Sequence, residues 1–403
     1  MKILVARRLF DGRNVQENVA VAFDTAIVET GSFEILETRY PSADVIRLEE
    51  DEVLLPGLIN PHVHLEFGAN TGHLVYGDFM AWLQSVITRR EELVEACRAA
   101  CYKRQIDAML KSGITTFGAV SSWGSDLTAC QASPQRVVYF SEIIGSQPAA
   151  VDALYADFIQ RLEAAQKAAS DRFVPAVAIH APYSVHPVLM RKVLKDTATL
   201  LLSAHFMESP AEKMWLEEGT GPFKPFFEKF LQQSSPLQTP QAFLDNLDRP
   251  ALLTHAVQAD EKLLDNIAEA GHTIVHCPRS NRLLACGRLA IERLSDRHIP
   301  WLVGTDGLSS NTSLTLWDEM RAALMLHHEA PLEAMAQRLL GAVTATAAEA
   351  LHLPIGRIEP GRLADLITCR LPFADLSMEQ LPLQLILHTH SAHRIYIGGK
   401  EYA

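Results

Sequence analysis

The sequence predicts an α/β fold in which a TIM (β/α)8 barrel is joined to a small β-domain. Two observations support this prediction. From about residue 55 onward, short apolar runs alternate with longer amphipathic segments, which is the pattern of parallel β/α units. Before and after that region, the chain contains short strand-like segments separated by turns. We therefore expect a barrel over residues 55–355 and a small β-domain formed by residues 1–54 together with residues 356–403.

Eight apolar runs are candidates for the barrel strands, and helical segments lie between most of them. The runs cover residues 53–60, 113–120, 136–143, 173–180, 200–206, 251–257, 272–277 and 299–306. The helical pattern is clear over residues 90–113, which end at Gly113, and over residues 332–353. In the first part of the chain we expect strands at residues 2–10, 19–24, 25–31 and 34–39.

The bulk composition indicates a globular enzyme of the cytoplasm. The chain has 403 residues and a net charge of -12, so nothing would neutralise the phosphates of a nucleic acid or of an anionic membrane. No apolar run reaches the ~18–20 residues that a membrane span requires. The six cysteines are scattered without a CxxC pair, which favours reduced thiols. We expect Cys97 and Cys101 to be buried thiols on one helix.

Polar residues of one chemical kind follow the predicted strands. In a TIM barrel the chemistry lies at the carboxyl ends of the strands. The residues found there are His62 and His64 after the first run, His180 after the fourth, His205 and then Glu208 after the fifth, His255 after the sixth and Asp306 after the eighth. A single histidine at a strand end is usually structural, but this combination is specific.

The pattern suits a metal site. His62 and His64 occupy alternate positions, so both can face the barrel mouth. Together with His205 and Asp306 they form a nitrogen and oxygen set that fits zinc or iron(II) and leaves room for a water. A bound metal would lower the pKa of that water from ~16 toward ~7. Glu208 could then move protons, while His255 could orient the nucleophile or polarise the substrate.

The segments "LLPGLINPHVHLEF", "AHFMES", "LLTHAV", "IVHCPRSN" and "GTDGLSSN" resemble, in this order, the amidohydrolase superfamily. The resemblance implies a distorted barrel with a small β-sandwich made from both chain ends. Two-metal members carry a lysine at the fourth strand, where this chain has His180, so the single-metal deaminase branch is implied. Its pattern makes His62, His64, His205 and Asp306 the ligands of one divalent ion, Glu208 the proton shuttle and His255 the second catalytic group.

Within that branch, "HCPRSN" and "HAPYS" are similar to deaminases of adenine nucleosides. This similarity implies that His180 contacts the substrate. The stretch from residue 66 to residue 93 is more similar to aminofutalosine deaminases, which remove the 6-amino group of 6-amino-6-deoxyfutalosine in menaquinone biosynthesis. In the adenosine-type relatives a glutamate holds the ribose hydroxyls, and Glu91 is the matching position here. The alternative interpretation of Glu91 is a solvated helix face.

The sequence is also compatible with other substrates and with another reaction. The substrate could instead be methylthioadenosine, S-adenosylhomocysteine or adenosine, or the enzyme could open a cyclic amide as imidazolonepropionase does. A non-catalytic barrel is disfavoured by the complete ligand set. The ribose of aminofutalosine carries a benzoate tail, and an arginine could bind the carboxylate of this tail. The candidates are Arg89, Arg90, Arg279 and Arg282. The partner is a small nucleoside, and a homodimer is the default expectation. His327 and His328 are expected to be exposed on a helix.

Overall fold

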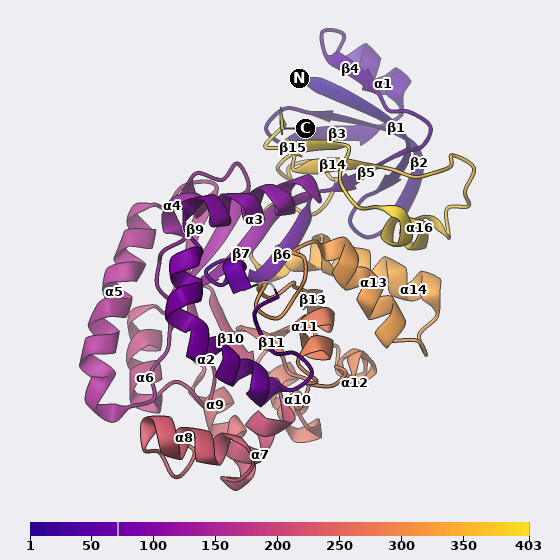
Figure 1. Ribbon diagram of the computed structural model, residues 1–403. Coiled ribbons are helices and arrows are strands. Elements are labelled where there is room, and N and C mark those ends of the chain that lie inside the picture. Colours follow the sequence, from indigo (N-terminus) through magenta and orange to yellow (C-terminus); the bar gives the residue numbers. More distant parts are fainter. Residues whose placement is uncertain (71, 403) are drawn as a thin grey trace.

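The computed structural model describes residues 1–70 and 72–402, so Thr71, within the stretch 66–93, and Ala403 lie outside it. Eight parallel strands form a barrel with helices around it (Figure 1). In spatial and chain order these strands are β6 (Leu58–Val63), β7 (Ile114–Ser121), β8 (Arg136–Ile143), β9 (Phe173–Ile179), β10 (Leu202–Phe206), β11 (Leu252–His255), β12 (Thr273–His276) and β13 (Trp301–Val303). The predicted barrel is confirmed.

The barrel interior is packed with apolar side chains and is not a channel. Ile59, Val120, Phe140, Leu252 and Leu302 are fully or almost fully buried and belong to one core cluster. The same cluster contains residues of α15 (Ala345–Ala350), which covers the amino-terminal end of the strands. Any cavity that opens into the barrel must therefore lie at the carboxyl ends of the strands.

The barrel helices follow the strands as the sequence indicated. Before β13 they are α2 (Phe79–Ala96), α3 (Ala99–Lys111), α4 (Leu127–Gln131), α5 (Val151–Lys167), α6 (Pro187–Asp196), α7 (Pro210–Glu218), α8 (Phe223–Leu231), α9 (Pro240–Asn246), α10 (Glu261–Glu269), α11 (Pro278–Leu283) and α12 (Ile291–Asp296). After β13 come α13 (Leu316–Leu326) and α14 (Leu332–Ala342), which precede α15. Short 3-10 turns occupy Gly68–Asn70 and Pro148–Ala150.

The predicted helix over residues 90–113 is interrupted. The chain turns at Cys97, where α2 ends, and α3 begins at Ala99. This turn brings Cys97 and Cys101 together, and the structure joins them in a disulfide. The expectation of two free thiols on one helix is therefore wrong, although both residues are buried as expected.

The two chain ends form one mixed sheet beside the barrel (Figure 1). Its order is β16 (Lys400–Glu401), β15 (Arg394–Ile397), β14 (Leu366–Arg370), β5 (Glu52–Pro56), β1 (Lys2–Phe10), β2 (Val15–Phe23) and β3 (Ile27–Gly31), while β4 (Asp44–Arg47) also pairs with β1. The chain ends also contain two helices: α1 (Phe33–Arg39), which packs on this sheet, and α16 (Leu381–His388), which packs against α13 and α14. Antiparallel pairing of β14 with β5 joins the two chain ends.

Two strand predictions need correction. Residues 34–39 form the helix α1, because Leu36 packs into the cluster of Ile3, Ala20 and Ala22 on one face of the sheet. The run 53–60 holds two strands, with β5 in the small sheet and β6 in the barrel.

The break between β5 and β6 falls at Gly57, where the chain passes from the small sheet into the barrel. A Cβ at Gly57 would lie 2.0 Å from Thr115 Oγ1, so only glycine fits at this crossing.

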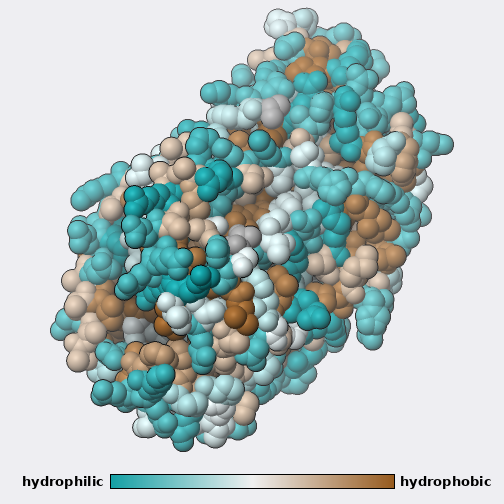
Figure 2. Space-filling view, viewed as in Figure 1, coloured by the Kyte–Doolittle hydropathy of each residue, from teal (hydrophilic) through white to brown (hydrophobic). Residues whose placement is uncertain are grey.

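The face of the molecule seen in Figure 2 is mostly hydrophilic, with apolar residues in scattered patches. Within the described residues, no helix is both long and apolar enough to cross a membrane.

A buried ion pair fastens the barrel to the small sheet. Arg136, at the start of β8, donates from Nε to Asp365 Oδ2 at 2.6 Å and from Nη2 to Asp365 Oδ1 at 3.1 Å. Both side chains are buried, and Asp365 Oδ1 also accepts from the backbone N–H of Gly398 at 2.7 Å. This two-pronged pair holds β14 and the chain's last hairpin against the base of the barrel.

We predict that Asp365→Ala lowers the free energy of unfolding by about 3–5 kcal/mol, because it leaves the Arg136 guanidinium buried without a counterion. Equilibrium urea denaturation measures the change. The double variant Arg136→Met/Asp365→Leu should lose much less, since neither charge then remains buried. A single variant as stable as the parent would contradict this role.

Candidate active site

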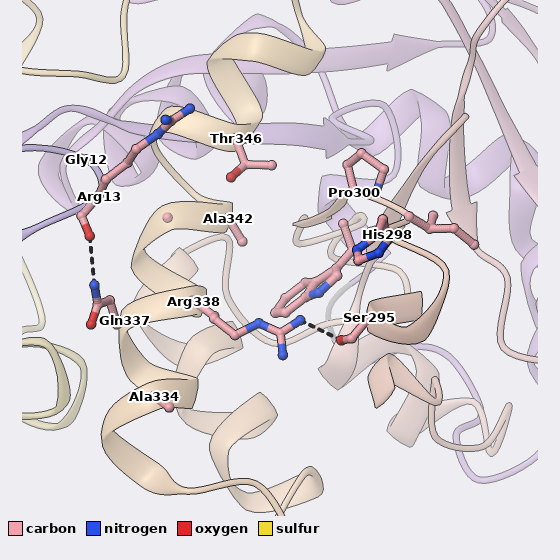
Figure 3. A pocket seen from close by; sticks show the side chains of 13 residues that line it. Gly12, Arg13, Ser295, His298, Pro300, Ala334, Gln337, Arg338, Ala342 and Thr346 are labelled. Carbon is pink, nitrogen blue, oxygen red and sulfur yellow. Dashed lines mark hydrogen bonds between the residues drawn. The ribbon is translucent and has the colours of Figure 1, made fainter. Parts of the chain in front are cut away.

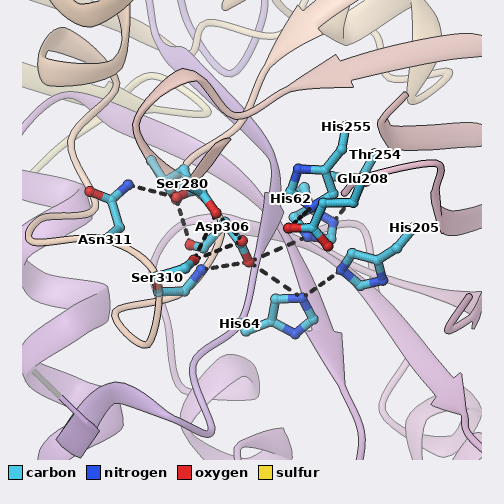
Figure 4. A network of polar contacts seen from close by, with 12 residues as sticks. His62, His64, His205, Glu208, Thr254, His255, Ser280, Asp306, Ser310 and Asn311 are labelled. Carbon is cyan, nitrogen blue, oxygen red and sulfur yellow. Dashed lines mark hydrogen bonds and ion pairs between the residues drawn. The ribbon is translucent and has the colours of Figure 1, made fainter. Parts of the chain in front are cut away.

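The structure brings together six of the eight predicted site residues at the carboxyl ends of the barrel strands (Figure 4). His62 lies within β6 and His64 just after it, His205 within β10, His255 at the end of β11, and Asp306 after β13, while Glu208 follows β10 in the turn before α7. All six come from strand ends or from the residues that directly follow, so the rigid sheet fixes their relative positions.

Four of these side chains point ligand atoms at one another. His64 Nε2 lies 3.1 Å from His205 Nε2. Asp306 Oδ1 lies 3.7 Å from His64 Nε2 and 3.8 Å from His62 Nε2. One nitrogen each of His62, His64 and His205 lies within 4.8 Å of the others. His62 Nε2 is buried and has no hydrogen-bond partner. A buried polar atom without a partner is unfavourable, unless a bound ion or ligand accepts the lone pair of this nitrogen.

The outward atoms of three of these residues, His62, His205 and Asp306, are held by hydrogen bonds. His62 Nδ1 pairs with Thr254 Oγ1 at 3.2 Å, and His205 Nδ1 pairs with the carbonyl oxygen of His180 at 3.0 Å. Asp306 Oδ2 accepts from two buried serine hydroxyls, of Ser280 and Ser310, each at 2.8 Å. Such outer partners fix ring orientation and tautomer in metal sites. The four residues therefore fit a divalent ion.

The electrostatics of the cluster favour the ligand forms of these groups. Burial lowers the pKa of His62 and lowers that of His205 well below its ordinary value, which favours the neutral form of both rings. Burial alone would raise the pKa of Asp306, but His62 and His64 hold it well below its usual range. Neutral imidazoles and an ionised carboxylate are the forms that bind metal.

Glu208 and His255 lie beside this cluster and face each other. Glu208 Oε1 is 3.5 Å from His255 Nε2. Burial, reinforced by the charges of Asp306 and Glu212, raises the pKa of Glu208 well above its ordinary value. Glu212 accepts from the backbone N–H groups of Met207 at 3.1 Å and Glu208 at 2.7 Å, which shapes the turn that presents Glu208. A carboxyl group of raised pKa can both accept and return a proton near neutral pH.

Backbone strain is concentrated at this site. Nine non-glycine residues in the described part of the chain have positive φ, and five of them surround the cluster. These five are Met207, His255, Ala256, Ala285 and Asp306, with φ between 48° and 76°. Such conformations cost of order 1–3 kcal/mol each and persist where surrounding contacts over-determine them. Two of the five, His255 and Asp306, carry the predicted chemistry themselves.

The two predicted substrate contacts differ in position. His180 lies next to the cluster, with its ring centroid 5.1 Å from that of His205, and its Nδ1 pairs with Ser184 Oγ. Glu91 is exposed on α2 and is not brought together with the histidines. The α2 helix does lie over the barrel mouth, since Trp82 Nε1 donates to the carbonyl of Ser309 at 2.8 Å, in the loop after β13.

The four arginines considered for binding a carboxylate tail of the substrate have different surroundings. Arg90 stacks on the Trp123 ring, with its guanidinium carbon 4.7 Å from the centroid, and Arg282 is exposed. Arg89 donates to the carbonyl of His73 at 3.0 Å. Arg279 is held by Ser313 and by the carboxylates of Asp318 and Glu319. Arg279 is therefore already paired with carboxylates of the protein. Arg90 instead lies on the ring of Trp123.

Sequence reasoning missed two features beside the cluster. Glu142, at the end of β8, is buried with an unpaired Oε1 and forms a second triad with His180 and His205. A lone carboxylate closing the apolar run 136–143 was the available signal. His327 was expected to be exposed, but it is buried and its Nε2 lies 3.2 Å from His276 Nε2. Only the fold could reveal that pair, because the two residues are far apart in sequence.

A hollow lies at the other end of the barrel from the histidine cluster and lacks the chemistry of that cluster (Figure 3). It is lined by residues of the β1–β2 turn, the segment before β13, and α14, among them Arg13, His298, Trp301 and Arg338. Pro300 directly precedes β13, so the hollow opens at the amino-terminal side of the strands. None of the eight predicted site residues lines it.

Comparison with known proteins agrees with the geometry. A model of the Amidohydrolase family matches residues 53–401. The aminodeoxyfutalosine deaminase of a Nitratiruptor species is 40% identical over 405 residues, covering 100% of this chain and 99% of that protein. The crystal structure of Helicobacter pylori aminofutalosine deaminase in complex with methylthio-coformycin superposes with a TM-score of 0.94 at 34% identity, covering 100% of both chains.

A more distant structure is that of an adenosine deaminase from Xanthomonas campestris with bound zinc. It has a TM-score of 0.80 at 25% identity and covers 99% of this chain and 92% of its own. The family match spans most of the chain, and it includes all the residues of the cluster. The chain belongs to the amidohydrolase family.

Proposed function

We propose that this protein is a metal-dependent deaminase that removes the 6-amino group of an adenine nucleoside, with 6-amino-6-deoxyfutalosine as its preferred substrate. The observation that carries the reaction is the placement of Glu208 and His255, facing each other at 3.5 Å beside the converging ligand atoms. The similarity to the Nitratiruptor and Helicobacter pylori deaminases over the full chain supports the substrate.

The residues that would hold the ion are His62, His64, His205 and Asp306, one divalent ion per chain. Zinc and iron(II) both accept such a set, and zinc is bound in the Xanthomonas campestris relative. When bound, such an ion lowers the pKa of a coordinated water from ~16 toward ~7.

Glu208 would carry the protons of the reaction. Its carboxylate takes a proton from the attacking water as the bond between the water oxygen and C6 of the adenine ring forms. It returns that proton to the ring nitrogen next to C6. It then takes the second proton of the former water, now on the C6 hydroxyl, and gives it to the amino nitrogen. The C6–N bond breaks, ammonia leaves, and a C6 carbonyl remains. The raised pKa of Glu208 suits a group that must bind and release a proton in one cycle. His255 Nε2, which is buried and unpaired, would orient the nucleophile.

Substrate recognition would use His180 at the base and Glu91 at the ribose. The position of α2 over the mouth supports a ribose contact, although Glu91 is exposed in the free protein.

The methylthio-coformycin in the Helicobacter pylori structure and the adenosine deaminase from Xanthomonas campestris favour a second candidate. That candidate is deamination of methylthioadenosine, S-adenosylhomocysteine or adenosine. A homodimer and a cytoplasmic location stay predictions.

The first prediction from this proposal concerns substrate preference. Metal-loaded protein should release ammonia from aminofutalosine with a higher kcat/KM than from methylthioadenosine, S-adenosylhomocysteine or adenosine. A coupled ammonia assay run in parallel on the four nucleosides measures this. A flat panel would favour the second candidate, and a ring-opened acid from a lactam substrate, with no ammonia, would point to a cyclic-amide hydrolase.

The second prediction concerns proton transfer. Glu208→Gln should lower kcat by at least ~10²-fold, because the amide cannot take the proton of the water. The bound metal, measured by elemental analysis, should stay the same. Glu217→Gln, on the exposed side of α7, is the matched control and should keep the parent kcat. Parent-like turnover in Glu208→Gln would exclude Glu208 as the shuttle.

The third prediction separates ligands from catalytic groups. Elemental analysis should find one divalent ion per chain in the parent protein. His64→Ala should lose that ion, because it removes one of four ligands. His255→Ala should keep it while turnover falls. Two ions in the parent protein, or loss of the ion in His255→Ala, would overturn the assignment of these residues.

A further inference from the structure

A short turn after β12 contacts both catalytic side chains. This turn, Asn281–Cys286, begins within α11 and ends just beyond it. Its first residue accepts a hydrogen bond from His255, with Asn281 Oδ1 2.8 Å from His255 Nδ1. Its last residue donates to Glu208, with Cys286 Sγ 3.8 Å from Glu208 Oε1. The two catalytic groups come from different strands, β10 and β11, yet one turn holds them both.

The Asn281–Cys286 turn is itself rigidly fixed. The Cys286 N–H donates to the carbonyl oxygen of Asn281 at 2.8 Å, which closes the turn on itself. Gln258 Nε2 donates to the carbonyl oxygen of Cys286 at 2.6 Å, which ties the turn to the loop after β11. Ala285 has a φ of 56°, a strained value that sets the direction of the Cys286 side chain. Asn281 and Cys286 are both fully buried.

The contact with Asn281 sets the tautomer of His255. A carbonyl oxygen can only accept, so the proton of the neutral ring must sit on Nδ1. Nε2 then carries a lone pair, and this is the atom that lies 3.5 Å from Glu208 Oε1. Asn281 Nδ2 is buried without a partner. Within the described residues, His255 is thus the hydrogen-bond partner of the Asn281 side chain.

The contact with Cys286 assigns different tasks to the two oxygens of Glu208. Oε1 faces both the thiol of Cys286 and His255 Nε2. Burial raises the pKa of the Cys286 thiol, so the group stays protonated and acts as a donor. Because the Cys286 thiol donates to Oε1, Oε2 is left to exchange protons with water and substrate.

We propose that the Asn281–Cys286 turn is a positioning clamp, in which Asn281 fixes the tautomer of His255 and Cys286 fixes the orientation of Glu208. Neither residue is one of the proposed metal ligands, and both act through a catalytic group. The inference rests on the proposed function. If the parent protein deaminates no nucleoside, the proposed function fails; if the parent is active and the variants below match it, the clamp alone fails.

The test compares deleting and conservative substitutions at both positions. Asn281→Ala should lower kcat by about 10–100-fold, as loss of an outer hydrogen-bond partner typically does, with little change in KM. Asn281→Asp should recover most of that loss, because a carboxylate still accepts from Nδ1–H. Cys286→Ala should lower kcat less, because a thiol is a weak donor. Cys286→Ser should recover it, because a hydroxyl donates to the same oxygen.

Two further measurements distinguish positioning from stability. Long-range ¹H–¹⁵N spectra of histidine-labelled protein report the tautomer of His255, whose signals are identified by their absence in His255→Gln. The parent protein should show the Nδ1–H form, and Asn281→Ala should show a mixture. Metal content and Tm should match the parent in all four variants. Asn246→Ala, which removes another hydrogen-bonded helical asparagine, should leave kcat unchanged.

Three outcomes would overturn the clamp. The first is a folded Asn281→Ala that keeps kcat within about twofold of the parent, a difference too small for a lost positioning contact. The second is a loss of kcat that follows metal content or Tm and is not recovered in Asn281→Asp. The third is a parent protein whose His255 carries its proton on Nε2.

Discussion

The site depends on how the barrel closes between its first and last strands. Asn60 in β6 donates from Nδ2 to Thr305 Oγ1 at 2.7 Å, and its Oδ1 accepts from the Thr305 N–H at 3.2 Å. The Asp306 N–H then donates to the carbonyl oxygen of His62 at 3.2 Å. Because these bonds fix the register, Asp306 is placed beside the two histidines of β6. A shift by one residue would turn its carboxylate away from them.

The glycines on either side of Asp306 make this closure possible. A Cβ at Gly304 would lie 2.9 Å from Val275 Cγ1, and one at Gly307 would lie 2.9 Å from the carbonyl oxygen of His64. The "GTDG" motif thus has a steric origin as well as a chemical one. Asp306 supplies the carboxylate, Gly304 leaves room for Val275 of β12, and Gly307 lets the chain after β6 approach. The positive φ of Asp306 is maintained by the same contacts.

The sequence predicted the parts of the fold that depend on local patterns. Strand positions followed from apolar runs, and the positions of the site residues other than Glu91 followed from the rule that barrel chemistry lies at strand ends. Asn281 and Cys286 could not be predicted, because their roles come from contacts between segments that are distant in the chain. The helix α1 was missed for a different reason. The Glu, Leu and Arg residues of 34–39 favour a helix, and Leu36 packs against the small sheet, but the strand-like segments before it suggested another strand.

Chemistry and selectivity are carried by different kinds of structure in this protein. His62, His205 and the other groups of the cluster sit on or directly beside strands whose register is fixed, so they can be shared by enzymes that act on different substrates. Selectivity must come from segments over the mouth, such as α2, where Trp82 and Arg90 contact residues of the loops. Strand-end motifs therefore define the reaction, whereas the choice among adenine nucleosides depends on the helix and loops that cover the mouth.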